Sequence, residues 1–240
     1  MKIIQTLICI LLAGLCLKTT AYIPTTEMIL SRLDRNQGTK NYKISQNILF
    51  LDRSRLDDTF QLKETWWKYA NRVYLQVRST EHPQLKLNFI YKKFYKTWMS
   101  GKAKKSKKQN YIESYFFRKN MRPAWLNSIE KVKLGRALGM VNYVFRKKEQ
   151  AVWIEQDNFV VRKIAMGNTA VLTAENYQIY TGGLLFPKKR TYKSPEIEVT
   201  MEVTHLEAIK KQWNHSLKSN KWEVSHGDIE MIKHFYQNIR

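Results

Sequence analysis

The sequence predicts a mainly β protein of the α+β class, with an up-and-down antiparallel sheet of about ten strands covered by short helices. Two observations predict this class. Short segments rich in β-branched and aromatic residues recur through the chain, and turn residues separate them every eight to twelve positions. The clearest example is Ala151–Thr191, where Asp157-Asn158, Gly167-Asn168 and Gly182-Gly183 separate four predicted strands.

The first 21 residues are expected to be a secretory signal peptide and not part of the fold. The apolar run Ile3–Leu17 is too short to span a bilayer, and small residues before Tyr22 suit a cleavage site. The alternative is a lipoprotein signal that uses Cys16, but the bulky Leu15 stands where a small residue is wanted. We therefore expect export, with cleavage near Ala21 and without a lipid on Cys16.

Cleavage would leave a chain that is strongly basic and free of cysteine. Both cysteines, Cys9 and Cys16, lie in the signal, so we expect no disulfide and no cysteine metal site. The formal net charge falls only from +22 to +20, because Lys2 and Lys18 are removed. This excess favours an anionic lipid surface or an acidic envelope protein as partner, and export argues against nucleic acid. The alternative is that the charge only aids solubility.

The first expected element after the signal is a short amphipathic helix. Thr25-Thr26 provides a capping hydroxyl, Glu27 suits the first turn, and Asn36-Gln37-Gly38 suits the end of the helix. An apolar stripe is expected to lie against a sheet. It consists of Met28, Ile29 and Leu33.

Four predicted strands follow, at residues 42–50, 61–69, 72–79 and 85–93. In the second, Trp66 and Trp67 are adjacent, so only one can face inward. A curved sheet with aromatic and aliphatic inner faces would suit an apolar ligand such as an acyl chain, although the same side chains could equally fill a core. The candidate lining residues are Val73, Leu75, Val77, Leu87, Phe89, Tyr91, Val152 and Ile154.

A lysine-rich segment interrupts this pattern. No acidic residue occurs between Glu81 and Glu113, where nine lysines do. We expect an exposed loop that contacts an anionic surface, or else a solvated turn. The candidates for this contact are Lys102, Lys104, Lys105, Lys107 and Lys108, together with Lys188, Lys189 and Arg190.

The second half adds helices at both ends of a further set of strands. Tyr111–Lys119 and Pro123–Glu130 have apolar faces at helical spacing, and strands are predicted at 139–145, within Ala151–Thr191 and at 197–206. Asp228–Ile239 is expected to be a helix with a stripe at Ile229, Ile232, Tyr236 and Ile239. We therefore expect one domain over residues 22–210 and a C-terminal extension over residues 211–240.

No recognisable catalytic, metal or cofactor motif occurs in the chain. There is no Gly-x-Ser-x-Gly elbow, His-Glu-x-x-His pair or phosphate-binding glycine loop, and no two of the five histidines have ligand spacing. Glu155 and Asp157 flank an ordinary turn and make a poor carboxylate pair. We expect no catalytic residue, no metal and no cofactor.

The order of segments resembles the periplasmic outer-membrane lipoprotein-sorting carriers and their relatives, the LolA-like family. The resemblance extends from Thr25 to Glu207 and rests mainly on Trp153–Asp157, Asn176-Tyr177 and Gly183–Lys188. It implies an incomplete antiparallel β-barrel, closed by helices, whose hydrophobic cavity carries lipid-modified proteins or other lipids. Some relatives instead sense envelope stress by binding partner proteins. The basic charge, the lysine-rich segment and the long tail depart from the family, and no single arginine here matches the one that latches the carriers' lid.

These observations predict a non-enzymatic periplasmic carrier or binder of a lipid or lipoprotein acyl chain. The alternative is an envelope protein-interaction or stress-sensing module that docks an acidic partner through its basic surface. An enzyme of unfamiliar type would need a cleft that holds a carboxylate or histidine with a strongly shifted pKa. Whether the sheet encloses an empty cavity distinguishes the first two hypotheses.

Overall fold

The computed structural model describes most of the chain between the predicted signal and the tail. The described residues are 23–37, 41–53, 59–69, 72–81, 86–92, 95–98, 104–105, 115–116, 122–210, 232 and 235–236. For residue 72, for all of 86–92 except Asn88, and for 95–98 and 104–105, only the backbone is described. The predicted signal peptide and most of the predicted extension lie outside these residues.

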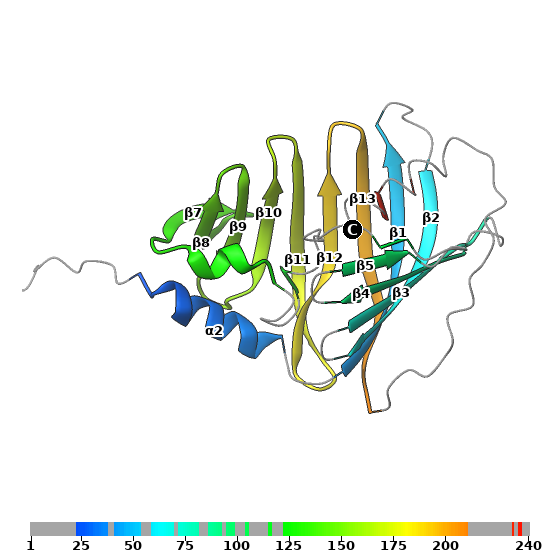
Figure 1. Ribbon diagram of the computed structural model, residues 1–240, viewed down its shortest axis with the longest axis horizontal. Coiled ribbons are helices and arrows are strands. Elements are labelled where there is room, and N and C mark those ends of the chain that lie inside the picture. Colours follow the sequence, from blue (N-terminus) through cyan, green and yellow to red (C-terminus); the bar gives the residue numbers. More distant parts are fainter. Residues whose placement is uncertain are drawn as a thin grey trace, which may run out of the picture.

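A single antiparallel sheet dominates the fold (Figure 1). In the described part of the chain it has thirteen strands in the order β6-β5-β4-β3-β2-β1-β13-β12-β11-β10-β9-β8-β7. Neighbours in sequence therefore pair, except for β6 and β7, which form the two edges of the sheet. The pairing of β1 with β13 joins the two halves. The strands are β1 (Asn41–Asp52), β2 (Thr59–Tyr69), β3 (Arg72–Ser79), β4 (Lys86–Lys92), β5 (Tyr95–Trp98), β6 (Lys104–Lys105), β7 (Lys133–Ala137), β8 (Met140–Lys147), β9 (Gln150–Glu155), β10 (Val161–Met166), β11 (Ala170–Tyr180), β12 (Leu184–Lys193) and β13 (Ile197–Ile209).

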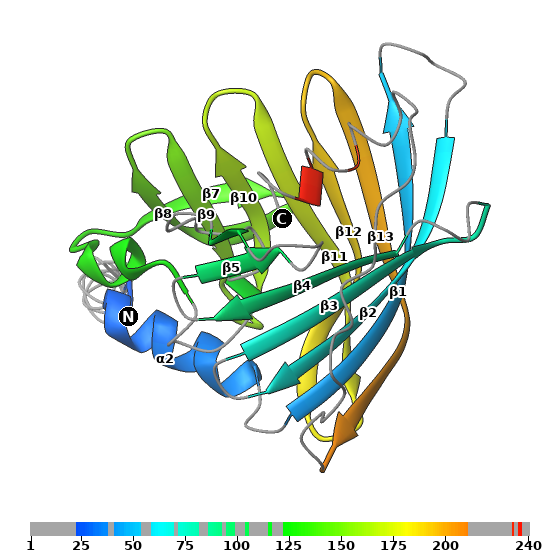
Figure 2. The same cartoon turned by 45° about the vertical axis from the view of Figure 1, so that its right-hand side comes forward.

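The sheet is strongly curved but open. Its strand order ends at β6 on one side and at β7 on the other, so it does not close into a barrel. Figures 1 and 2 show β3–β5 turning across the concave side of the sheet toward β9–β12. The mainly β class and the incomplete barrel are therefore confirmed.

Alternating side chains place the core on the concave face. In β1, every second residue from Tyr42 to Phe50 is buried, and in β13 the same holds from Ile197 to Val203. A register shift at Ser45/Gln46 interrupts the β1–β13 pairing, so the next buried residue of β13 is Leu206. In β2, Trp66 is buried whereas Trp67 is only half-buried. A period of two thus decides which of the two tryptophans faces inward.

Three strands, β5, β6 and β7, were not predicted from the sequence. Of these, β7 forms a hairpin with β8 through Leu138 and Gly139, whose φ angles are 52° and 76°. Two positive φ values are typical of the tight hairpin turn, which usually has Asn or Gly at both positions. Because Leu138 is unusual at such a position, the sequence gives no clear signal of this turn. The strand β10 begins at Val161 and not at the predicted Phe159, because Phe159 has a φ of 51° and belongs to the preceding turn.

The helix α2 (Thr26–Asn36) has the predicted start. The Thr25 hydroxyl accepts a hydrogen bond of 3.3 Å from the Met28 amide, and Glu27 lies in the first turn. The predicted apolar stripe is wrong at one position, because Met28 is exposed and Leu30 is buried with Ile29 and Leu33. Among the described residues, no helix combines the length and the apolar character needed to cross a membrane.

Helical segments cover one end of the concave face. The predicted helix at 123–130 is the 3-10 helix η2 (Ala124–Ser128), in which Trp125 and Leu126 are buried. The start of α2 joins it through a hydrogen bond from the Thr26 hydroxyl to the Ile129 carbonyl. Figures 1 and 2 show both elements along the ends of β8–β11. Only Tyr115 and Phe116 of the predicted helix at 111–119 are described, and both are buried.

Candidate ligand site on the concave face

The predicted lining residues with described side chains all belong to the buried concave face. On β3 these are Val73, Leu75 and Val77, and on β9 they are Val152 and Ile154. The three candidates of β4 are known only by backbone register, which pairs Val73 with Tyr91, Leu75 with Phe89 and Val77 with Leu87. Their side chains lie outside the described residues.

Residues near the C-terminus occupy the centre of this face. Ile232, Phe235 and Tyr236 have no exposed surface at all. The Phe235 ring lies edge-on to Phe50 of β1 at a centroid distance of 5.1 Å and at 5.5 Å from Tyr192 of β12. Phe50 and Tyr192 both pair in register with Val199 of β13. Phe235 therefore packs against a row of apolar residues across the three central strands.

A buried polar cluster lies beside this apolar row. The Glu64 carboxylate accepts hydrogen bonds from the Tyr236 hydroxyl, the Gln46 amide and, at 2.8 Å, the Trp66 indole. The Gln46 carbonyl in turn accepts a hydrogen bond from the Arg190 guanidinium. Glu64, Gln46 and Arg190 are each at most 2% exposed. A carboxylate and a guanidinium are costly to bury alone, and here a shared amide connects them.

The burial of Arg190 excludes it from the predicted surface contact. Its guanidinium lies 5.0 Å from the centre of the Phe186 ring and 5.6 Å from that of Phe116. Consecutive side chains on a strand point to opposite faces, so the run Lys188-Lys189-Arg190 cannot form one basic surface. Lys189 is exposed, and Lys188 is half-buried and lies 4.0 Å from Glu202.

The other predicted surface contacts cannot be placed by their side chains. Lys104 and Lys105 form the backbone of β6, which pairs with β5. Lys102, Lys107 and Lys108 lie outside the described residues. The anionic-surface contact of this segment therefore stays a prediction.

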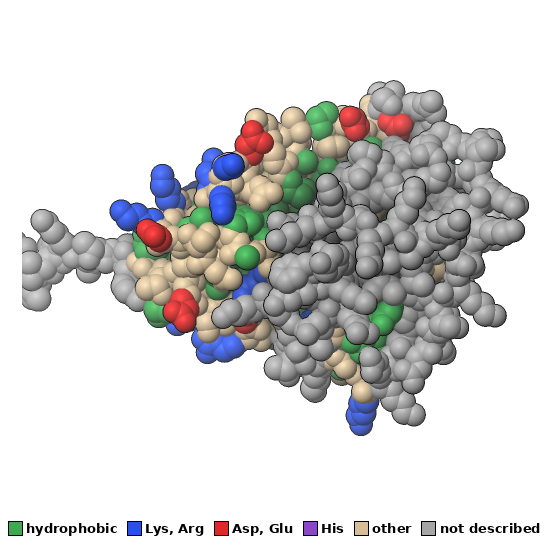
Figure 3. All heavy atoms as spheres, in the orientation of Figure 1, with side chains coloured by type: hydrophobic (Ala, Val, Ile, Leu, Met, Phe, Trp, Pro, Cys, Tyr) green, Lys and Arg blue, Asp and Glu red, His purple; other side chains and the backbone are tan. Residues whose placement is uncertain are grey.

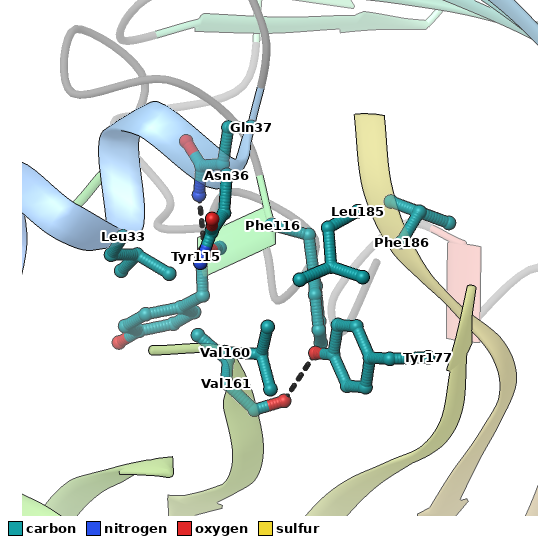
Figure 4. A pocket seen from close by; sticks show the side chains of 10 residues that line it. All are labelled: Leu33, Asn36, Gln37, Tyr115, Phe116, Val160, Val161, Tyr177, Leu185 and Phe186. Atoms are coloured by element: carbon teal, nitrogen blue, oxygen red, sulfur yellow. Dashed lines mark hydrogen bonds between the residues drawn. The ribbon is translucent and has the colours of Figure 1, made fainter. Parts of the chain in front are cut away.

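A small pocket marks the junction of α2 with the sheet (Figure 4). The Gln37 amide donates to the Tyr115 carbonyl at 3.2 Å, and burial raises the pKa of the Tyr115 hydroxyl to about 12. The space that the centre of a water molecule can reach is about 10 Å³, which suits about one water and not an acyl chain. The lining residues are Leu33, Asn36, Gln37, Tyr115, Phe116, Val160, Val161, Tyr177, Leu185 and Phe186.

Two ion pairs stabilise this end of the molecule, one between the two covering elements and one within the sheet. Arg122, just before η2, binds both carboxylate oxygens of Asp34 on α2 at 2.7 and 2.8 Å. Burial lowers the pKa of Arg122, while Asp34 opposes that shift. Glu155 binds Arg162 and accepts a hydrogen bond of 2.6 Å from Asn158. Glu155 therefore organises the turn between β9 and β10, which supports a structural role for this carboxylate.

No metal-binding group is present in the described part of the chain, where no three His, Cys, Asp or Glu side chains converge. Described carboxylates such as Glu64 and Glu155 are instead held by neighbouring donors. The geometry described so far offers an apolar face with one polar cluster, which suits binding by burial and hydrogen bonding.

Comparison with known proteins identifies the fold through structure alone. No family model matches the chain, and no curated protein sequence matches it. Solved structures do match. A LolA superfamily protein from Nitrosomonas europaea is 11% identical with a TM-score of 0.56, and the match covers 79% of this chain and 96% of that one. The fold is LolA-like.

Two further structures agree with this LolA-like fold. A putative outer membrane lipoprotein-sorting protein domain from Vibrio parahaemolyticus is 10% identical with a TM-score of 0.56, covering 79% of this chain and 94% of its own. A DUF1329 family protein from Desulfovibrio piger is 8% identical with a TM-score of 0.55, and the match covers 76% of this chain and 91% of that one. The resemblance inferred from the order of segments is confirmed at the level of fold.

Within this LolA-like sheet, the polar cluster and the aromatic Phe235 were not predicted as site residues. The alternation in both strands carried a signal. Gln46 lies between the inward residues Ile44 and Ile48 of β1, and Glu64 lies between the inward residues Leu62 and Trp66 of β2. Strict alternation therefore places both polar side chains on the concave face.

Proposed function

We propose that this protein is a non-enzymatic, exported binder or carrier of a lipid or of the acyl chain of a lipoprotein, and that the concave face is its ligand site. The observation that carries the proposal is the buried, largely apolar face of an open, curved sheet, which the polar cluster of Glu64, Gln46 and Arg190 interrupts. It extends from Val73–Val77 on β3, through Phe50 and Val199, to Val152 and Ile154 on β9. Each methylene buried there would contribute about 0.8 kcal/mol, so an acyl chain is the natural occupant.

The covering elements also support the proposal. The sheet edges at β6 and β7 are not paired with each other, so the concave face is covered by α2, η2 and the C-terminal residues rather than by closure of the sheet. Covering segments can move without disrupting the strand ladder. A ligand of this kind would enter where they now pack, since the described pocket at the junction is too small to hold it.

The test uses residues 22–240 and a photoreactive fatty acid. After illumination and digestion, we expect label on concave-face peptides of β1, β3, β9 and β12, with saturable uptake of a fluorescent fatty acid. Co-purified lipid would be identified by mass spectrometry. Label confined to outward positions, such as the 78%-exposed Ile179, would contradict the proposal.

A protein-interaction module is the second candidate, favoured by the packed concave face. Figure 3 shows Lys and Arg side chains gathered at the end of the molecule that carries β7–β9. The exposed cations of this end are Lys131, Lys133, Arg136, Arg146, Lys147 and Lys148. This candidate predicts salt-sensitive capture of an acidic envelope protein and no lipid uptake. Charge reversal at Lys133 and Arg136 would abolish that capture.

A further inference from the structure

We propose that the C-terminal segment carrying Ile232, Phe235 and Tyr236 is a built-in occupant of the ligand site, displaced by a ligand that has both an acyl chain and a hydrogen-bond donor. This inference rests on the proposed function and adds the ligand's chemical class and the event that admits it.

The position of these side chains is the first argument. All three are fully buried, although they follow β13, the last strand in the described part of the chain, which ends at Ile209. They do not extend the sheet. They pack on the middle of its concave face, over β1, β13 and β12, which is where the proposed acyl chain would lie.

The contacts of Phe235 are those of an apolar ligand. The centre of its ring lies 5.1 Å from that of Phe50, 5.5 Å from that of Tyr192 and 5.3 Å from that of its neighbour Tyr236, and all three pairs are edge-on. The row of Phe50, Val199 and Tyr192 beneath it belongs to the sheet itself. Removal of Phe235 would therefore leave an apolar surface that an alkyl chain can cover.

Tyr236 supplies the polar part of the same contact. Its hydroxyl donates a hydrogen bond to Glu64, whose carboxylate also binds Trp66 and Gln46. If Tyr236 leaves, a buried carboxylate loses a donor, which is unfavourable unless the ligand replaces it. A hydroxyl or an amide N–H can do so. An ionised carboxylate head group cannot, because it has no hydrogen to donate to Glu64.

The site is thus expected to prefer neutral acyl compounds with a donor over free fatty acids. A monoacylglycerol and the amide-linked acyl chain of a lipoprotein share this chemistry. While the segment occupies the site, a ligand can bind only to the fraction of molecules in which the site is open. Its apparent affinity is the intrinsic affinity multiplied by that fraction. Weakening the segment should therefore tighten binding without a new contact to the ligand.

The experiment compares wild type with Tyr236→Phe, which removes one hydroxyl and keeps the ring. Tyr180→Phe on β11, at a half-buried tyrosine, is the matched control. Affinities are measured for monooleoylglycerol, oleamide, methyl oleate and oleate. Loss of a hydrogen bond to a charged group should favour displacement by about tenfold or more. We expect Tyr236→Phe to bind monooleoylglycerol about tenfold more tightly, with Tyr180→Phe unchanged.

A second readout reports on the segment itself. Trypsin cleavage after Lys233 releases the peptide His234–Arg240. Because the neighbouring Ile232 and Phe235 are buried, the rate of this cleavage should report how often the segment leaves the sheet. Monooleoylglycerol should raise its rate in wild type, and Tyr236→Phe should raise it without ligand. Circular dichroism confirms that both variants are folded.

The outcomes separate the two proposals. If wild type binds acyl probes, but Tyr236→Phe binds no more tightly and ligand leaves cleavage unchanged, the segment is permanent core and this inference is overturned while the proposed function stands. Equal affinity for methyl oleate and monooleoylglycerol would overturn the role of Glu64. If no probe binds any of the proteins, the proposed function fails, and this inference fails with it.

Discussion

Replacement of Arg162 by Met should destabilise the protein strongly, because it leaves a buried carboxylate without its cation. The side chains of Arg162 and Glu155 are only 9% and 4% exposed, and they form a direct ion pair. The guanidinium also lies 4.9 Å from the centre of the Tyr177 ring. Arg162 thus connects the β9–β10 turn with β11.

The expected magnitude follows from this burial. Removal of one partner of a buried ion pair typically costs about 3–5 kcal/mol, whereas an exposed pair contributes about 0–1 kcal/mol. The double variant Glu155→Leu/Arg162→Met buries no charge at this point. The double variant should therefore lose less free energy of unfolding than the two single variants lose in sum, by about 2 kcal/mol or more.

Urea unfolding of residues 22–240 at about pH 7, followed by far-ultraviolet circular dichroism, measures these losses. Lys43→Met is the matched control, because Lys43 pairs with Glu207 at 3.2 Å on the surface, where both side chains are more than a third exposed. The reasoning is refuted if Arg162→Met costs no more than Lys43→Met. It is also refuted if the losses of Arg162→Met and Glu155→Leu simply add.

Three further changes have defined outcomes. Burial acts to raise the pKa of Glu198, but Arg53 at 2.9 Å and Lys193 at 3.0 Å outweigh it and hold that pKa below its usual value. The stabilisation that the Glu198 carboxylate provides is therefore present above the unfolded-state pKa of about 4.3 and is lost as the pH falls through the folded-state pKa. Glu198→Gln should lower the free energy of unfolding by about 0.5–1 kcal/mol near neutral pH and leave it unchanged in acid. Gly183→Ala should lower the free energy of unfolding in urea by about 1–2 kcal/mol, because Gly183 has a φ of 78°. No atom lies within 4 Å of an added Cβ, so the whole loss comes from the backbone conformation, and an unchanged midpoint would contradict this. Lys189→Glu should weaken binding to anionic vesicles about tenfold at low salt, with phosphatidylcholine vesicles as the control, and equal binding would remove Lys189 from the proposed contact.

Much of the fold could be predicted from the sequence because strands and helix ends leave local signals. The ten predicted strands and the capped start of α2 all depend on residues within a few positions of one another. The short strands β5, β6 and β7 lack such a signal. In β7, the sequence Lys-Leu-Gly-Arg-Ala has neither clear alternation nor β-branched residues, and its turn hides a positive φ at Leu138.

The site depends on contacts that no local pattern records. Arg190 looks like part of a basic surface run, yet it meets Gln46, which is 144 positions away, in the core. Glu64 and Tyr236 are 172 positions apart, and Tyr236 was predicted only as one residue of a helical stripe. Burial of a charged group depends on whether distant partners supply hydrogen bonds, and a sequence window holds no information about them.

The sequence by itself determined the class of the fold, which residues of most strands share one face, the basic character of the chain and the absence of recognisable catalytic motifs. These follow from composition and from the strand period of two. Only the tertiary structure decided that β1 joins β13, that the sheet stays open, and that the chain's own C-terminal aromatic residues fill the face expected to hold a ligand. The physical reason is that packing and pairing across the sheet are set by shape and hydrogen-bond complementarity between segments far apart in the chain.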